Sequence, residues 1–70
     1  MSVIFRVEID RETDGCWIAE VAELPGVMAY GATEEEAVAK VQALALRVVA
    51  DRLEQGEASR EYIHISFKAA

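Results

Sequence analysis

Two segments near the start of the chain alternate between apolar and polar side chains, which is the pattern of strands with one buried face. Their apolar residues are Val3, Phe5, Val7 and Ile9 in the first segment and Trp17, Ala19 and Val21 in the second. An antiparallel hairpin places apolar against apolar only when Val7 lies opposite Val21, so that paired residue numbers sum to 28. The connection must then be odd in length, and the Thr-Asp-Gly run at 13–15, with a glycine bulge, meets that requirement.

Turn and capping residues delimit the next elements. The Leu-Pro-Gly-Val run at 24–27 suits a type II turn, after which a short strand is expected over residues 27–30. Thr33 and Glu36 form a capping box that predicts a helix over residues 34–55. The apolar side chains on one broad arc of this helix are Ala37, Val38, Val41, Leu44, Ala45, Val48 and Val49.

Residues 61–67 alternate again and predict a last strand, in which Ile63, Ile65 and Phe67 face inward. The helical connection before it is long enough for a parallel crossover. These elements predict one α+β domain over residues 1–70, with the order β-β-β-α-β. Its four strands form a mixed sheet of order 3-2-1-4, and the single helix packs on one face.

Charge and cysteine content narrow the classes of partner. The chain has 70 residues, of which 53% are hydrophobic, and this fraction is too high for a disordered polymer. Thirteen acidic residues outnumber seven basic ones, which argues against direct binding of nucleic acid and favours a basic protein partner. Cys16 is the only cysteine, so the chain can form neither an intrachain disulfide nor a cysteine-based metal site.

Targeting and membrane-spanning patterns do not appear in the sequence. The first residues contain no basic segment followed by an apolar run, which a signal peptide requires. No apolar run approaches the roughly 20 residues of a membrane span. We therefore expect a cytoplasmic protein without membrane contact.

One helix covers only one face of such a sheet, and the other face carries acidic and aliphatic side chains. The predicted register sets Glu8 opposite Glu20, a like-charge pair that is mildly destabilising in isolation, and puts Asp10 on the same face. A basic partner would relieve this repulsion. We therefore predict a partner-binding surface that contains Glu8, Asp10 and Glu20, with Glu12 and Glu23 nearby. An ordinary solvated face is the alternative.

Two patterns could indicate a metal site or a catalytic residue, and neither meets the requirements of that chemistry. Residues 10–15 resemble the start of an EF-hand calcium loop, but two ligand positions do not fit. The third position, which requires Asp or Asn, is Glu12, and the twelfth, which requires Glu, is Val21. His64 is the only histidine, and Ser66 stands about 6.6 Å away along the same strand face, beyond hydrogen-bond reach. We therefore expect no catalytic residue, metal ion or cofactor.

Three short motifs occur at the hairpin, at the turn and at the helix start. They are Asp14-Gly15-Cys16-Trp17-Ile18-Ala19, Glu23-Leu24-Pro25-Gly26 and Gly31-Ala32-Thr33-Glu34-Glu35-Glu36-Ala37. In order and spacing they resemble the HicB-like antitoxins of bacterial type II toxin–antitoxin pairs, over residues 3–67. The resemblance implies a partial ribonuclease-H-like fold that binds and silences a small basic RNA-cleaving toxin, HicA.

The resemblance implies an antitoxin that occludes the toxin and catalyses nothing itself. Many family members carry a C-terminal DNA-binding segment, but only residues 68–70 follow the last predicted strand, so we expect a short form without direct nucleic acid binding. An enzyme related to ribonuclease H would need several convergent carboxylates, and no fourth one on the helix obviously joins Glu8, Asp10 and Glu20. The alternative to an antitoxin is an orphan, self-associating domain without a toxin partner.

The predicted helix is longer than the strands beneath it. Residues 34–55 span about 33 Å as a helix, whereas a strand of about seven residues covers about 23 Å. The apolar arc continues to the end of the helix, and Leu46 adds an apolar side chain on the opposite face. We therefore predict a homodimer or higher homo-oligomer in which Leu46, Val49 and Leu53 contact a second subunit.

Overall fold

The alternating segments pair into one sheet, and the segment between the third and fourth strands forms a helix. The computed structural model describes residues 2–57 and 60–70 of the chain. Its elements are β1 (Ser2–Arg11), β2 (Trp17–Val21), β3 (Met28–Gly31), the helix α1 (Glu34–Glu54), the 3-10 helix η1 (Arg60–Ile63) and β4 (His64–Ala69). Apart from η1, this is the predicted order.

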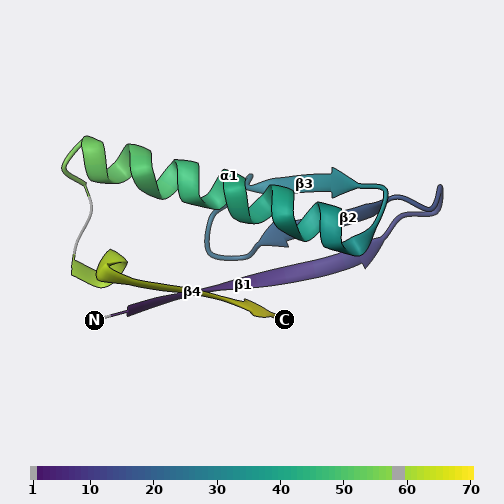
Figure 1. The fold of residues 1–70 in the computed structure, drawn as a ribbon, viewed down its shortest axis with the longest axis horizontal. Coiled ribbons are helices and arrows are strands. Elements are labelled where there is room, and N and C mark those ends of the chain that lie inside the picture. Colours follow the sequence, from purple (N-terminus) through teal and green to yellow (C-terminus); the bar gives the residue numbers. More distant parts are fainter. Residues whose placement is uncertain (1, 58–59) are drawn as a thin grey trace.

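The sheet has the strand order β3-β2-β1-β4. Short turns make β1 antiparallel to β2 and β2 antiparallel to β3. The crossover through α1 returns the chain in the same direction, so β4 pairs parallel to β1. Figure 1 shows α1 running along the β2–β3 side of the sheet, with β4 at the opposite edge. The structure therefore confirms the predicted α+β fold and its sheet order.

The hairpin between β1 and β2 has the predicted register. Val7 lies opposite Val21 and Ile9 opposite Ala19, so the paired numbers sum to 28. The Glu12 N–H donates to the carbonyl oxygen of Cys16 at 2.7 Å and closes the loop around residues 13–15. The odd loop keeps the apolar side chains of both strands on one face.

The turn between β2 and β3 is closed by a hydrogen bond from the Val27 N–H to the Leu24 carbonyl oxygen at 3.0 Å. Gly26 has φ of +85°, which only glycine adopts without strain and which a type II turn requires at this place. Leu24 and Val27 are both buried, so the ends of the turn contribute side chains to the core.

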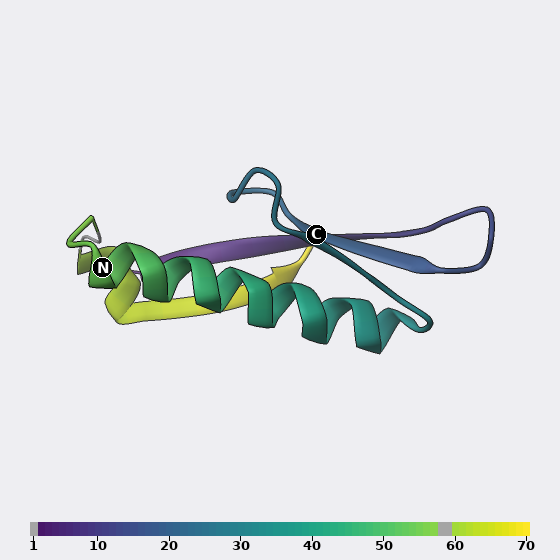
Figure 2. The same ribbon diagram turned by 90° about the horizontal axis from the view of Figure 1, so that it is seen from above.

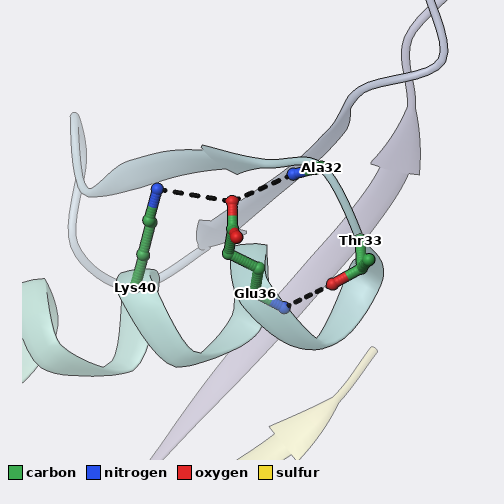
Figure 3. A network of polar contacts seen from close by, with 4 residues as sticks. All are labelled: Ala32, Thr33, Glu36 and Lys40. Carbon is green, nitrogen blue, oxygen red and sulfur yellow. Dashed lines mark hydrogen bonds and ion pairs between the residues drawn. The ribbon is translucent and has the colours of Figure 1, made fainter.

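Helix α1 begins at the predicted capping box (Figure 3). The Glu36 N–H donates to the hydroxyl oxygen of Thr33 at 3.1 Å. The Glu36 carboxylate in turn accepts the N–H of Ala32 at 3.0 Å and lies 3.4 Å from the ammonium group of Lys40. These contacts hold the pKa of Glu36 below its ordinary value, first through the Ala32 bond. Two backbone N–H groups that the helix itself cannot satisfy are thereby paired.

Gly31 permits the close approach of β3 to the start of α1. A Cβ atom at this position would stand 2.5 Å from the backbone nitrogen of Ala37 and 2.9 Å from the Cβ of Glu36. Backbone atoms of a helix cannot move away cheaply, so a side chain here would displace the helix from the sheet. This requirement comes from residues only five and six positions further along the chain, which the turn into α1 brings back against β3.

The core lies between α1 and one face of the sheet. Its buried residues are Phe5, Val7, Ala19, Val21, Leu24, Val27, Ala37, Val41, Ala45 and Val49. The helix contributes every fourth residue, which places small and β-branched side chains in a row against the strands. Val38, Leu44 and Val48 are half-buried beside that row, as the predicted apolar arc requires.

The last strand differs from its prediction at its start. Residues 60–63 form η1, so the two-residue alternation begins only at β4. Ile63 is 67% exposed and does not face inward, whereas Tyr62 is half-buried and its hydroxyl accepts a hydrogen bond from the guanidinium of Arg52 at 3.0 Å. A 3-10 turn does not preserve the two faces of a strand, and for that reason the inward prediction for Ile63 is wrong. Ile65 and Phe67 do face inward.

Replacing Thr33 by alanine removes the oxygen that accepts the Glu36 N–H. We expect the Thr33→Ala variant to lose about 1 kcal/mol of unfolding free energy, measured by urea denaturation. Thr13→Ala is the matched control, because the Thr13 side chain is exposed in the hairpin loop. Equal stabilities for the two variants would contradict a capping role for Thr33.

Replacing Gly31 by alanine tests the close approach of β3 and α1. The φ of Gly31 is not positive, so backbone entropy alone predicts that Gly31→Ala is neutral or stabilising. The contact with the Ala37 backbone predicts instead that Gly31→Ala is destabilising and loses about 1–3 kcal/mol of unfolding free energy. A thermal or urea unfolding curve decides between them, and a stabilised variant would overturn the steric explanation.

Candidate protein-interaction face

Helix α1 lies over one face of the sheet (Figure 2), and no helix formed by residues 2–57 and 60–70 lies over the opposite face. Because side chains alternate along a strand, this face carries the residues that do not enter the core. They are Ile4, Arg6, Glu8 and Asp10 on β1, Ile18 and Glu20 on β2, Met28 and Tyr30 on β3, and His64, Ser66 and Lys68 on β4. We call this surface the open face.

Four of the predicted partner-binding carboxylates lie together at the hairpin end of the molecule. Glu8 pairs directly with Glu20 across β1 and β2, and Asp10 lies opposite Ile18. A shallow hollow of about 330 Å³ is lined by Glu8, Ile9, Asp10, Glu12, Ile18 and Glu20. We call its carboxylates Glu8, Asp10, Glu12 and Glu20 the acidic cluster.

The charge of the acidic cluster is only partly balanced: the pKa of Arg6 is raised mainly by its hydrogen bond to Glu23, and the charge of Glu8 contributes as well. Among residues 2–57 and 60–70, the two ion pairs lie elsewhere, between Arg6 and Glu23 and between Lys40 and Glu36. Like charges opposite each other on neighbouring strands repel, so the cluster weakens the isolated fold slightly. A cationic group placed over the hollow would remove that repulsion and would be attracted to it.

Glu23 stands apart from the acidic cluster because it is bonded to Arg6. Its carboxylate accepts the Arg6 backbone N–H at 2.8 Å and the guanidinium Nε–H at 2.7 Å. These hydrogen bonds hold the pKa of Glu23 below its ordinary value and raise the pKa of Arg6. The structure therefore brings four of the five predicted carboxylates together and leaves Glu23 with a partner of its own.

Two exposed residues extend the acidic cluster toward the β3 edge, and sequence reasoning did not select them. Met28 is 40% exposed and lies opposite Glu20, while Tyr30 is 54% exposed and lies opposite Ile18. Methionine and tyrosine are enriched in protein interfaces, where glutamate is depleted. The alternation within the expected third strand contained this signal, because residues 28 and 30 fall on its outer side.

Trp17 does not lie on the open face. Its ring is half-buried against the core, and the guanidinium of Arg11 stands 5.6 Å from the ring centroid. The two residues are direct partners across β1 and β2, so the cation–π contact covers the outer end of the core. This agrees with a packing role for Trp17.

The remaining reactive side chains lie separately. His64 and Ser66 are exposed on β4, opposite Ser2 and Ile4 respectively, and Cys16 is an exposed free thiol. Within the described ranges, no three His, Cys, Asp or Glu side chains are arranged to hold a metal ion. No helix formed by these residues has the length and apolar character needed to cross a membrane.

The residues predicted to join two subunits fall into two groups. Leu46 is 46% exposed and Leu53 is 52% exposed on the outer side of α1. Val49 is only 3% exposed and packs within the core of its own chain. It cannot contact a second subunit without leaving that core, so only Leu46 and Leu53 are available for such a contact.

Comparison with known proteins gives no further constraint on this surface. No protein-family model, no curated protein and no solved structure matches the chain.

The bond between Arg6 and Glu23 makes a prediction about acid stability. A carboxyl group whose pKa is lowered by folding stabilises the fold above its unfolded pKa, and this contribution disappears as the pH falls through the folded value. We expect wild-type stability to fall between about pH 5 and pH 3 more steeply than that of Glu23→Gln, measured as urea unfolding free energy. Glu12→Gln removes the same charge from the hairpin end and is the control. A wild-type slope equal to that of Glu23→Gln would contradict the contribution of this bond.

Proposed function

We propose that the chain is an antitoxin-like protein that binds a small basic RNA-cleaving toxin of the HicA type and occludes its surface. The acidic cluster beside Met28 and Tyr30 carries this proposal, because it combines unbalanced negative charge with side chains suited to an interface. In this mechanism the chain performs no catalysis. Its carboxylates occupy the cationic groups with which the toxin would otherwise hold RNA.

The distribution of charge along the chain supports this partner. Residues 1–43 contain nine acidic and three basic residues, whereas residues 44–70 contain four of each. The whole net charge of −6 therefore belongs to the part that forms the hairpin, β3 and the first half of α1. A field concentrated at one end steers a basic partner toward that end and raises the association rate.

The resemblance to HicB-like antitoxins supports the same class of partner, although the residues that carry it have structural roles in this chain. Gly26 is required by its turn, Gly31 by the close approach of α1, and Thr33 by the helix cap. The motifs that carry the resemblance are thus architectural in this chain. They support a HicB-like, partial ribonuclease-H-like fold, and the partner class is inferred from that fold together with the acidic cluster.

The cellular compartment follows from the proposed partner. A toxin that cleaves RNA acts in the cytoplasm, so an antitoxin must meet it there.

A self-associating domain without a toxin is the second candidate. The exposed leucines of α1 favour it, because Leu46 and Leu53 lie on the outer side of α1, away from the acidic cluster. The two candidates differ in what they require. An antitoxin requires a basic partner, whereas an orphan domain requires only a second copy of itself.

Co-expression with a small basic protein encoded by the neighbouring reading frame tests the antitoxin proposal directly. The basic protein alone should arrest growth, and this chain should restore growth and co-purify with it. The absence of such a reading frame, or arrested growth in the presence of this chain, would favour the orphan domain. Metal-dependent RNA cleavage by the purified chain would instead indicate an enzyme.

Charge reversal tests the acidic cluster. We expect Glu8→Lys with Glu20→Lys to slow association with the toxin by about tenfold or more and to reduce its salt dependence, measured by stopped-flow or surface-based kinetics. Glu54→Lys with Glu57→Lys makes the same change in net charge at exposed positions of the other half of the chain. Equal effects of the two double variants would show that only net charge matters, and the open face would be abandoned as the site.

A further inference from the structure

The outer side of α1 carries a second apolar row, distinct from the row that enters the core. The buried row, residues 37, 41, 45 and 49, repeats every fourth residue. The outer row alternates steps of four and three, and all of its members are exposed. They are Ala39, Ala43, Leu46, Ala50 and Leu53. We call this row the α1 seam.

Alternating steps of four and three have a mean spacing of 3.5 residues, the repeat with which two helices pack along a shared seam. The α1 seam extends over about 21 Å of the helix. Its alanines allow another helix to approach closely, and its two leucines supply apolar area that water now contacts. A lone surface helix has no need of such spacing on its exposed side.

The α1 seam is complementary to itself about a twofold axis. When two copies of α1 run antiparallel with the axis at Leu46, this residue faces its own copy. Leu53 then lies against Ala39 of the second copy, and Ala50 lies against Ala43. Large side chains meet small ones at both ends, and alanine meets alanine on either side of the axis, where the two helices can approach closely. Twofold pairing is also the commonest closed assembly.

Charge distinguishes this surface from the acidic cluster. Helix α1 contains five acidic and three basic residues, so two copies of α1 repel less than two copies of the acidic cluster would. A basic partner is attracted more strongly to the acidic cluster than to α1. The two surfaces therefore suit different partners.

The size of the exposed surface also favours association with a second copy. The chain exposes 4729 Å², whereas about 4,300 Å² is expected for a folded protein of this mass. Its radius of gyration is 12.7 Å, against about 11 Å for a compact chain of this length. A hollow of about 370 Å³ adjoins the α1 seam at Ala39 and is lined by Ile9, Glu34, Glu35, Val38, Ala39, Gln42 and Ala69. A stable dimer buries roughly 800 Å² on each partner, so surface beside the five seam residues must take part as well.

We propose that two copies of this chain form a homodimer by antiparallel packing of α1 through Ala39, Ala43, Leu46, Ala50 and Leu53. The acidic cluster lies on the opposite face of the sheet and stays free in this dimer. The dimer does not depend on the antitoxin proposal, because its test needs only the purified chain.

Sedimentation equilibrium measures the assembly. At about 100 μM the wild type should have twice the protomer mass of 7.7 kDa, and Leu46→Glu should have the protomer mass with an unchanged circular dichroism spectrum. Ile4→Glu makes the same change at an exposed apolar residue of the open face and should stay dimeric. A monomeric wild type, a dimeric Leu46→Glu, or dissociation by Ile4→Glu alone would overturn the proposal.

Cysteine cross-linking tests the register independently of stability. In a Cys16→Ser background, Leu46→Cys places two thiols at the twofold axis, where mild oxidation should join them. Ala39→Cys places its two thiols about 21 Å apart along the paired helices, so it should remain uncross-linked. Efficient cross-linking through position 39 with none through position 46 would show a different pairing of the helices and would overturn the antiparallel seam.

Discussion

The strict alternation of β1 is the constraint on which the rest of the structure depends. Phe5 and Val7 are buried on one side of this central strand, and Glu8 and Asp10 are exposed on the other. Both neighbouring strands must adopt registers that match these two sides, because a shift by one residue would exchange them. The core and the acidic cluster are therefore two consequences of one pattern.

Helix α1 combines two apolar rows that have different periods. The row with a step of four drifts around the helix and follows the twisted sheet, whereas the row with a mean step of 3.5 drifts less and suits a second helix that coils gently around the first. Both rows are apolar: the buried row consists of alanine and valine, and the α1 seam consists of alanine and leucine. Exposure separates them: Val49 is buried, while Leu46 and Leu53 are in contact with water.

Charged and exposed apolar side chains are separated along the long axis of the molecule, which measures 40 Å. The hairpin end carries the unbalanced carboxylates, and the end formed by the last turns of α1 and by η1 is electrically neutral with exposed Leu53 and Ile63. Charge and apolar surface are thus separated in one small chain. In the two proposals above, a basic protein and a second copy of the chain would bind to different faces.

The sequence by itself determined the register of β1 with β2, the helix cap and the sheet order, because these follow from side-chain periodicity, from residues a few positions apart and from the lengths of the connections. Tertiary structure decided three other features. Arg6 and Glu23, 17 positions apart, form an ion pair that removes Glu23 from the acidic cluster. Gly31 is required because the first turns of α1 fold back against it at Glu36 and Ala37. The exposure of Ile63 was set by η1. The alternation of apolar and polar residues encodes none of these features, because each depends on how the chain is placed in three dimensions.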